Sequence, residues 1–152
     1  MSAIEQNREI TLTRVFNAPA SVLFEAYSKP EHIKRWFGPV GYPVTTAKID
    51  FRVGGSFWFQ MTGPTGELNT PFGGTYLEVV PNEKLRYTDV FDDPNLPGEM
   101  VTTITLKTVS CGTDFTAVQE GIPEMIPPEM CYLGWQESLR MLARVVEPEI
   151  PG

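Results

Sequence analysis

The sequence predicts one α+β domain, in which a curved antiparallel sheet of about seven strands wraps round a single long C-terminal helix. Three observations support this prediction. Between residues 42 and 120, short segments of alternating polarity follow one another at intervals of roughly ten residues, separated by turn residues. Two short helical segments come after the first strand. The last helical segment, 129–147, carries the only long apolar stripe, so the sheet needs it as cover.

Composition limits the possible functions. The 152 residues fit one domain, predicted to span 1–152 with its core at about 9–147. A net charge of −7 argues against nucleic-acid binding, which needs a basic face. The sequence has no apolar run long enough to cross a membrane, and Met1–Arg8 lacks the apolar centre of a signal peptide. We therefore expect a cytoplasmic protein with no nucleic-acid or membrane partner.

The first strand and two short helices open the chain. Residues 9–16 alternate apolar and polar side chains, which predicts a strand, and a short helix follows over 19–27. The buried side of that helix is predicted to comprise Val22, Leu23, Ala26 and Tyr27. Ser28–Glu31 has the spacing of a capping box, with Pro30 at the first helical position. It predicts a second short helix that ends at Gly38-Pro39.

From Tyr42 onward the period of the apolar residues is two, which is typical of strands. The turns contain glycine, proline and asparagine, as at Gly54-Gly55 and Pro81-Asn82-Glu83. The alternation predicts six further strands at 44–51, 56–61, 74–80, 85–91, 101–108 and 114–120. Joined by tight turns, they predict an antiparallel meander.

The last helix has an uneven apolar face. Pro128 fits its first turn and Pro148 its end. The face comprises Cys131, Trp135, Ser138, Leu139, Leu142, Val145 and Val146, with Gly134 and Met141 at its edges. Toward the N-terminal end, Cys131, Gly134 and Ser138 are small or polar where a packed core favours leucine. Either a large side chain of the sheet fills this region or a cavity remains there.

Motifs spread along the chain carry a resemblance to a known family. They are Arg14–Pro19, Pro30-Glu31-His32 with Trp36–Pro39, Asp50–Gly55, Gly74 with Tyr76 and Glu78, Leu85–Asp89, and Gly134-Trp135 with Leu139 and Leu142. In order and spacing, the chain resembles the helix-grip fold of the START-like (SRPBCC) superfamily over about residues 9–147. More narrowly, it is similar to the C-terminal domain of activators of the heat-shock chaperone ATPase (AHSA-like). The resemblance implies the fold more strongly than an activity.

The inward sheet face and the last helix define the candidate site. START-like relatives often use an apolar cavity there for hydrophobic or aromatic ligands, and the alternative is an ordinary core. We predict a cavity lined by Phe57, Phe59, Met61, Tyr76, Tyr87, Asp89, Phe91, Gln119, Cys131, Trp135, Ser138 and Leu139, with Trp36 and Phe37 at its mouth. The two mouth residues could instead anchor the short helices. Buried hydroxyl and indole groups need partners, which a ligand could supply.

Three polar residues fall by alternation on this inward face: Glu78, Asp89 and Gln119. A buried carboxylate costs several kcal/mol unless it is paired. We therefore predict a structural ion pair between Arg52 and Glu78, with Arg14 as an alternative cation. The other interpretation is a carboxyl group with a raised pKa that acts as an acid or base.

Cysteine and histidine are too few for a recognisable metal or nucleophile site. Cys111 and Cys131 are predicted to be free thiols, and a catalytic Cys131 would need a base, whereas the single histidine, His32, lies in a distant helix. We expect no metal and no cofactor. No catalytic motif assigns catalytic residues.

Three functions remain open from the sequence. We favour a carrier or sensor that binds a small hydrophobic or aromatic molecule. A homodimer is compatible with this function. The first alternative is an enzyme of cyclase, aromatase or hydrolase type that uses the same cavity. The second is a co-chaperone-like activator, which is disfavoured because true activators carry an additional N-terminal domain that this sequence lacks.

Overall fold

The computed structural model describes residues 8–147. Its elements are β1 (Ile10–Phe16), α2 (Ala20–Ser28), α3 (Pro30–Trp36), β2 (Val44–Ile49), β3 (Ser56–Met61), β4 (Phe72–Val80), β5 (Lys84–Phe91), β6 (Met100–Val109), β7 (Gly112–Glu120) and α4 (Pro128–Val146). The strands form one seven-stranded sheet in the order β1-β7-β6-β5-β4-β3-β2, and every pairing is antiparallel. The predicted α+β class and order of elements are confirmed. Pro148 lies outside the described residues.

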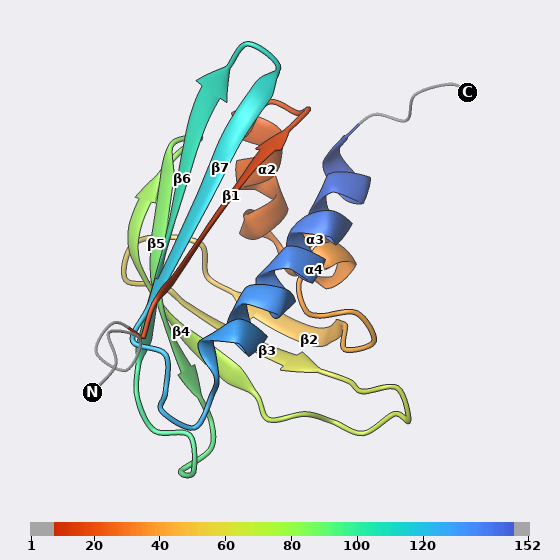
Figure 1. Cartoon of the computed structure of the whole chain (residues 1–152), viewed down its shortest axis with the longest axis vertical. Helices are drawn as coiled ribbons and strands as arrows, with labels where there is room; N and C mark the ends of the chain where they lie inside the picture. The colour runs from red at the N-terminus through yellow and green to blue at the C-terminus, as the bar shows by residue number, and fades with distance from the viewer. Residues whose placement is uncertain (1–7, 148–152) are drawn as a thin grey trace.

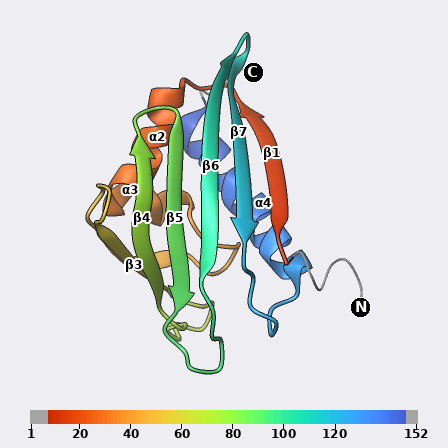
Figure 2. The ribbon, with the colours of Figure 1, turned by 90° about the vertical axis from the view of Figure 1, so that its left-hand side faces the viewer.

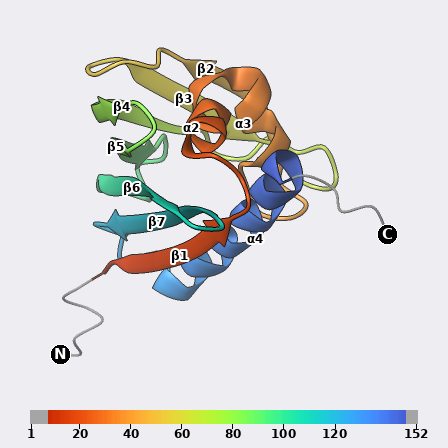
Figure 3. The same ribbon diagram turned by 90° about the horizontal axis from the view of Figure 1, so that it is seen from above.

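The sheet curves round the helices, as Figure 1 and the view from above in Figure 3 show. The helix α4 crosses the concave side, with α2 and α3 beside it, and Figure 2 shows the other side of the sheet without a covering helix. This arrangement follows from the apolar stripe of α4, which buries Trp135, Leu139 and Leu142 against the sheet. The main core therefore lies between the concave sheet face and the three helices.

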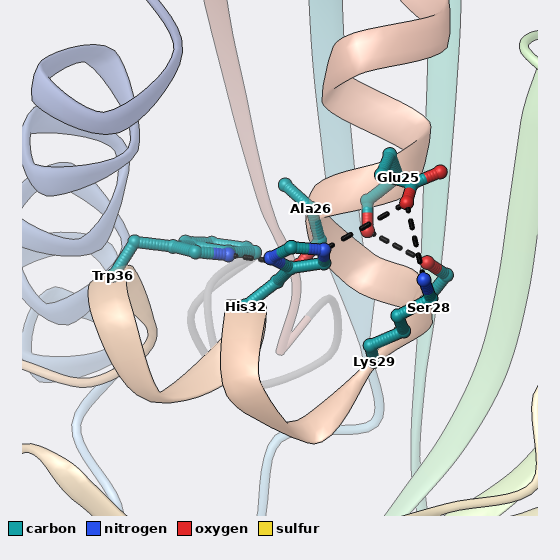
Figure 4. A network of polar contacts seen from close by, with 6 residues as sticks. All are labelled: Glu25, Ala26, Ser28, Lys29, His32 and Trp36. Atoms are coloured by element: carbon teal, nitrogen blue, oxygen red, sulfur yellow. Dashed lines mark hydrogen bonds and ion pairs between the residues drawn. The ribbon is translucent and has the colours of Figure 1, made fainter.

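The junction between α2 and α3 differs from the predicted capping box (Figure 4). Ser28 is the last residue of α2, and its hydroxyl donates to the Glu25 carbonyl at 2.7 Å. The cap of α3 is Lys29, which makes no side-chain capping bond, and Pro30 is at the start of α3 as predicted. The capping box is wrong because Ser28 still belongs to the preceding helix. The predicted burial of Val22 is also wrong, since the residue is 39% exposed.

A bulge in β4 changes the side of the sheet on which Glu78 lies. The register pairs Tyr76 with Tyr87 but Glu78 with Arg86, so it shifts between Tyr76 and Glu78. Glu78 therefore lies with Arg86 on the outer face, where its carboxylate is 3.2 Å from the Lys84 ammonium and 4.0 Å from the Arg86 guanidinium. The predicted inward position of Glu78 is wrong, because strict alternation cannot register an inserted residue.

Candidate functional site

A cavity of about 150 Å³ lies between the sheet, α4 and the segment that follows α3. Its walls are formed by Phe37, Gly38, Pro39, Met61, Phe72, Tyr87, Asp89, Phe91, Met100, Gln119, Cys131, Gly134, Trp135 and Ser138. Most of these side chains are apolar, and five are aromatic. A cavity of this size matches a single six-membered aromatic ring, because an apolar void of about 150 Å³ is known to accept benzene.

Small residues of α4 leave this space. No atom of the described residues outside the neighbouring chain and helix backbone lies within 4 Å of the position that a Cβ at Gly134 would occupy. Cys131 and Ser138 lie one turn before and one turn after it on the same wall. The thin part of the apolar face predicted from the sequence therefore coincides with the cavity.

Most of the predicted lining residues lie in this wall, and four do not. Phe57, Phe59 and Tyr76 surround a separate space of about 10 Å³, too small for more than one water molecule. Leu139 is a core residue and lines neither space. Trp36 is 2% exposed and its indole N–H donates to the Ala26 carbonyl at 3.0 Å, so it anchors α3 to α2 and does not form a mouth (Figure 4).

Phe37 lines both spaces, and its place at the mouth of the cavity stays a prediction. Phe72 and Met100 are absent from the predicted lining, because the strands predicted from alternation begin at Gly74 and Val101, whereas β4 and β6 begin at Phe72 and Met100. Extending each alternation backward by one period from Gly74 and Thr102 would have placed both side chains on the inward face. At Gly74 itself a Cβ would lie 1.9 Å from the Thr88 carbonyl oxygen, so this close strand approach requires glycine.

Most polar groups around the cavity are satisfied by the protein. The Trp135 indole N–H donates to the Gln119 side-chain oxygen at 3.2 Å, and the Gln119 amide donates to the Thr102 hydroxyl at 3.5 Å. The Gly38 backbone N–H donates to the Ser138 hydroxyl at 3.0 Å. The Trp135 indole, whose partner a ligand could have supplied, is therefore satisfied by Gln119 of the protein itself.

The Tyr87 hydroxyl also has a protein partner, because it lies 3.3 Å from the Tyr27 hydroxyl. Burial raises the pKa of both phenols well above the ordinary value. Both groups stay neutral at physiological pH. They contribute hydrogen-bonding capacity and no charge to the surroundings of the cavity.

Asp89 is the exception among these polar groups. It is only 7% exposed, and its Oδ1 atom has no hydrogen-bond partner in the part of the chain that the structure describes. Burial raises the pKa of this carboxyl to about 8, so it is mostly protonated at pH 7. The inward position of Asp89 agrees with the sequence prediction, because β5 alternates regularly through Leu85 and Tyr87.

The arginines proposed as partners of inward carboxylates lie elsewhere. Arg52 pairs with Asp50 at 2.9 Å, which replaces the predicted pair between Arg52 and Glu78. The guanidinium of Arg14 lies over the Phe16 ring, 5.4 Å from its centroid. Neither arginine therefore neutralises the buried carboxyl group of Asp89.

The thiols and the histidine do not form a catalytic centre with Asp89. Burial raises the pKa of the Cys131 thiol, which makes its nucleophilic thiolate less available. His32 lies on α3 with its Nε2 atom 3.7 Å from the Glu25 carboxylate (Figure 4). Cys111 is exposed. Residues 8–147 contain no group of three or more metal-binding side chains. None of the helices described in this range is long and apolar enough to span a membrane.

Comparisons with known proteins agree with this architecture. A crystal structure of a protein from Chromobacterium violaceum is 48% identical, with a TM-score of 0.86 over 93% of this chain and 98% of that one. The AHSA1 protein from Silicibacter pomeroyi is 22% identical with a TM-score of 0.78, over 90% of this chain and 96% of that one. A protein from Rhizobium leguminosarum is 21% identical with a TM-score of 0.81, over 94% and 96%. These last two likenesses concern the fold alone.

No protein with a curated description matches this sequence. The model of the family described as "Activator of Hsp90 ATPase homolog 1-like protein" matches residues 17–147, which include both short helices, six of the seven strands and α4. With this match and the 48% identical relative, the resemblance seen in the sequence is confirmed. The chain belongs to the family of Activator of Hsp90 ATPase homolog 1-like proteins.

Proposed function

We propose that this protein binds a small hydrophobic or aromatic molecule in the cavity between the sheet and α4, as a carrier or sensor. The observation that carries the proposal is the cavity of about 150 Å³ in a wall of mainly apolar side chains. Burying a single aromatic ring there removes its apolar surface from water, at about 25 cal/mol per Å² of apolar area. The small residues of α4 keep this region from being filled by the protein itself.

Binding of toluene to the wild-type protein provides the direct test. Amide chemical shifts of the lining residues, followed by NMR during a titration, are expected to change saturably. Gly134→Leu should fill the cavity and weaken binding at least about tenfold, whereas Gly134→Ala adds one methyl group and serves as the matched control. Saturable binding that Gly134→Leu leaves unchanged would contradict the proposed site, and no saturable change in the wild type would contradict the proposed function.

A second candidate is an enzyme that transfers a proton within the same cavity. One observation favours it: the buried carboxyl of Asp89 has a pKa of about 8, near the pH at which a general acid or base is most effective. An Asp89-dependent exchange of hydrogen for deuterium, next to the carbonyl of a single-ring ketone in D₂O, would support this activity. Exchange at the same rate with Asp89→Asn would exclude Asp89 from it.

We also infer that residues 1–152 form one domain in the cytoplasm, and that homodimers are compatible with this function. Size-exclusion chromatography with light scattering tests the oligomeric state, and limited proteolysis tests the domain assignment. A stable fragment much shorter than residues 9–147 would contradict a single domain.

A further inference from the structure

The charge balance of the cavity wall is uneven. Of the described residues that line it, Asp89 alone has a carboxyl group, and none has a cationic side chain. The other polar side chains near it are already hydrogen-bonded, as the contacts of Gln119, Trp135 and Ser138 show. Asp89, by contrast, keeps unused hydrogen-bonding capacity, since its Oδ1 atom is buried and has no partner among the described residues.

Aromatic rings form much of the remaining wall. The centroid of the Phe37 ring lies 6.2 Å from that of Phe72 and 6.3 Å from that of Trp135, and Phe72 lies 6.1 Å from Phe91. The faces of such rings attract cations, and the attraction reaches about 2 kcal/mol when the cation is desolvated. A carboxylate would complement the same cation. Carboxylate and ring faces both disfavour an anionic ligand.

From this geometry, and on the basis of the ligand binding proposed above, we propose that the ligand is a small organic amine bound as its ammonium ion, with Asp89 as its counter-ion among the aromatic rings. The volume of about 150 Å³ limits the molecule to about one ring with a short amine-bearing arm. Once Asp89 has lost its proton, an ammonium ion neutralises the buried carboxylate and also contacts the ring faces, which an uncharged polar ligand does not do. The net charge of −7 attracts cations toward the protein.

The groups that face Asp89 do not supply this positive charge. They are the phenols of Tyr27 on α2 and Tyr87 on β5 and the thiol of Cys131 on α4, all with a raised pKa, mainly because of burial. All three are neutral near pH 7. Asp89 has to lose its own proton when an ammonium ion binds. Since the pKa of its carboxyl is about 8 in the unliganded protein, the affinity should fall by up to about tenfold per pH unit below 8.

Three single-ring probes test the proposal: benzylamine, benzyl alcohol and toluene. Their dissociation constants are measured by calorimetry or NMR titration of the full chain at pH 8 and pH 6. We expect benzylamine to bind at least about tenfold more tightly than benzyl alcohol at pH 8, and to lose most of that preference at pH 6. Asp89→Asn should abolish the preference and retain toluene binding. Glu78→Gln, which removes a carboxylate of the outer sheet face, is the matched control and should retain it.

The outcomes separate this inference from the proposed function. If toluene binds but benzylamine shows no preference, or if Asp89→Asn keeps the preference, the amine is wrong and the cavity remains a hydrophobic site. If none of the three probes binds saturably, the proposed function fails as well. Should Asp89→Asn not fold, the pH dependence of the wild type decides, since affinities for benzylamine that are equal at pH 6 and pH 8 would overturn the role of Asp89.

Discussion

Filling the cavity from α4 should stabilise the protein. Gly134 is the position of choice, because a Cβ there meets no atom outside its own chain neighbours and helix backbone within 4 Å. Replacing a helical glycine by alanine gains about 1 kcal/mol in helix propensity alone. In Gly134→Leu, burying most of the leucine side chain adds roughly 1–2 kcal/mol. The expected total is a rise of about 2–3 kcal/mol in the free energy of unfolding.

The magnitude is large enough to measure in a thermal or urea melt. For a domain of this length, about 2–4 °C in Tm corresponds to each kcal/mol, so Gly134→Leu should melt roughly 4–12 °C above the wild type. Gly134→Ala isolates the propensity contribution and should rise by only about 2–4 °C. In a close-packed core the same leucine would instead cost about 1–3 kcal/mol. A Gly134→Leu protein that melts below Gly134→Ala by several degrees would refute the reasoning, because the wall would then have no room.

The remaining predictions concern three buried residues and the activity of a chaperone. Ser138→Leu should lose about 1–3 kcal/mol of stability, since the buried Gly38 N–H loses its acceptor, and a urea melt equal to that of the wild type would contradict this. Leu142→Ala should cost about 2–5 kcal/mol in the same assay, because Leu142 is fully buried on α4, and a loss below about half a kcal/mol would mean that α4 packs through another face. The pKa of Asp89 is raised in the folded state, so its contribution should lower the free energy of unfolding of the wild type by about 1.4 kcal/mol per pH unit as pH rises from about 4 to 8. Asp89→Asn should lack this slope. Parallel pH profiles of the two proteins would argue against a buried neutral acid. Adding the protein to purified Hsp90 should leave the rate of ATP hydrolysis unchanged, because the function proposed here needs only the internal cavity; a several-fold stimulation would favour the activity in the family description.

The sequence predicted the elements well where periodicity alone decides them. The helix α4 and all seven strands lie within two residues of their predicted bounds, since alternation or a helical stripe marks each of them. The regular β5 strand also placed Asp89 inward correctly. By contrast, the bulge between Tyr76 and Glu78 depends on the pairing of β4 with β5. Local alternation carries no information about such a register shift.

The site was predicted less completely than the fold, for a related reason. Whether an inward aromatic residue lines a cavity or packs in the core depends on the contacts of its neighbours in three dimensions. Phe57 and Phe91 are both phenylalanines that alternation places on the inward face of the sheet. Only Phe91 lies in the wall of the larger cavity. Hydrogen bonds are equally non-local: the partner of the Trp135 indole is Gln119 on β7, and no spacing in the sequence indicates that pairing.

The position of β1 has a consequence for the order in which the molecule assembles. Its neighbour in the sheet is β7, so Ile10 pairs with Gln119. A second contact between distant parts of the chain is the hydrogen bond that the Gly38 N–H donates to the Ser138 hydroxyl on α4. Contacts between residues so far apart in sequence close long loops of chain, which is characteristic of slow-folding topologies. The wall that holds Asp89 is complete only after α4 has docked, because Cys131, Trp135 and Ser138 belong to it. During synthesis, the cavity should therefore form last, once α4 has left the ribosome and covered the concave face of the sheet.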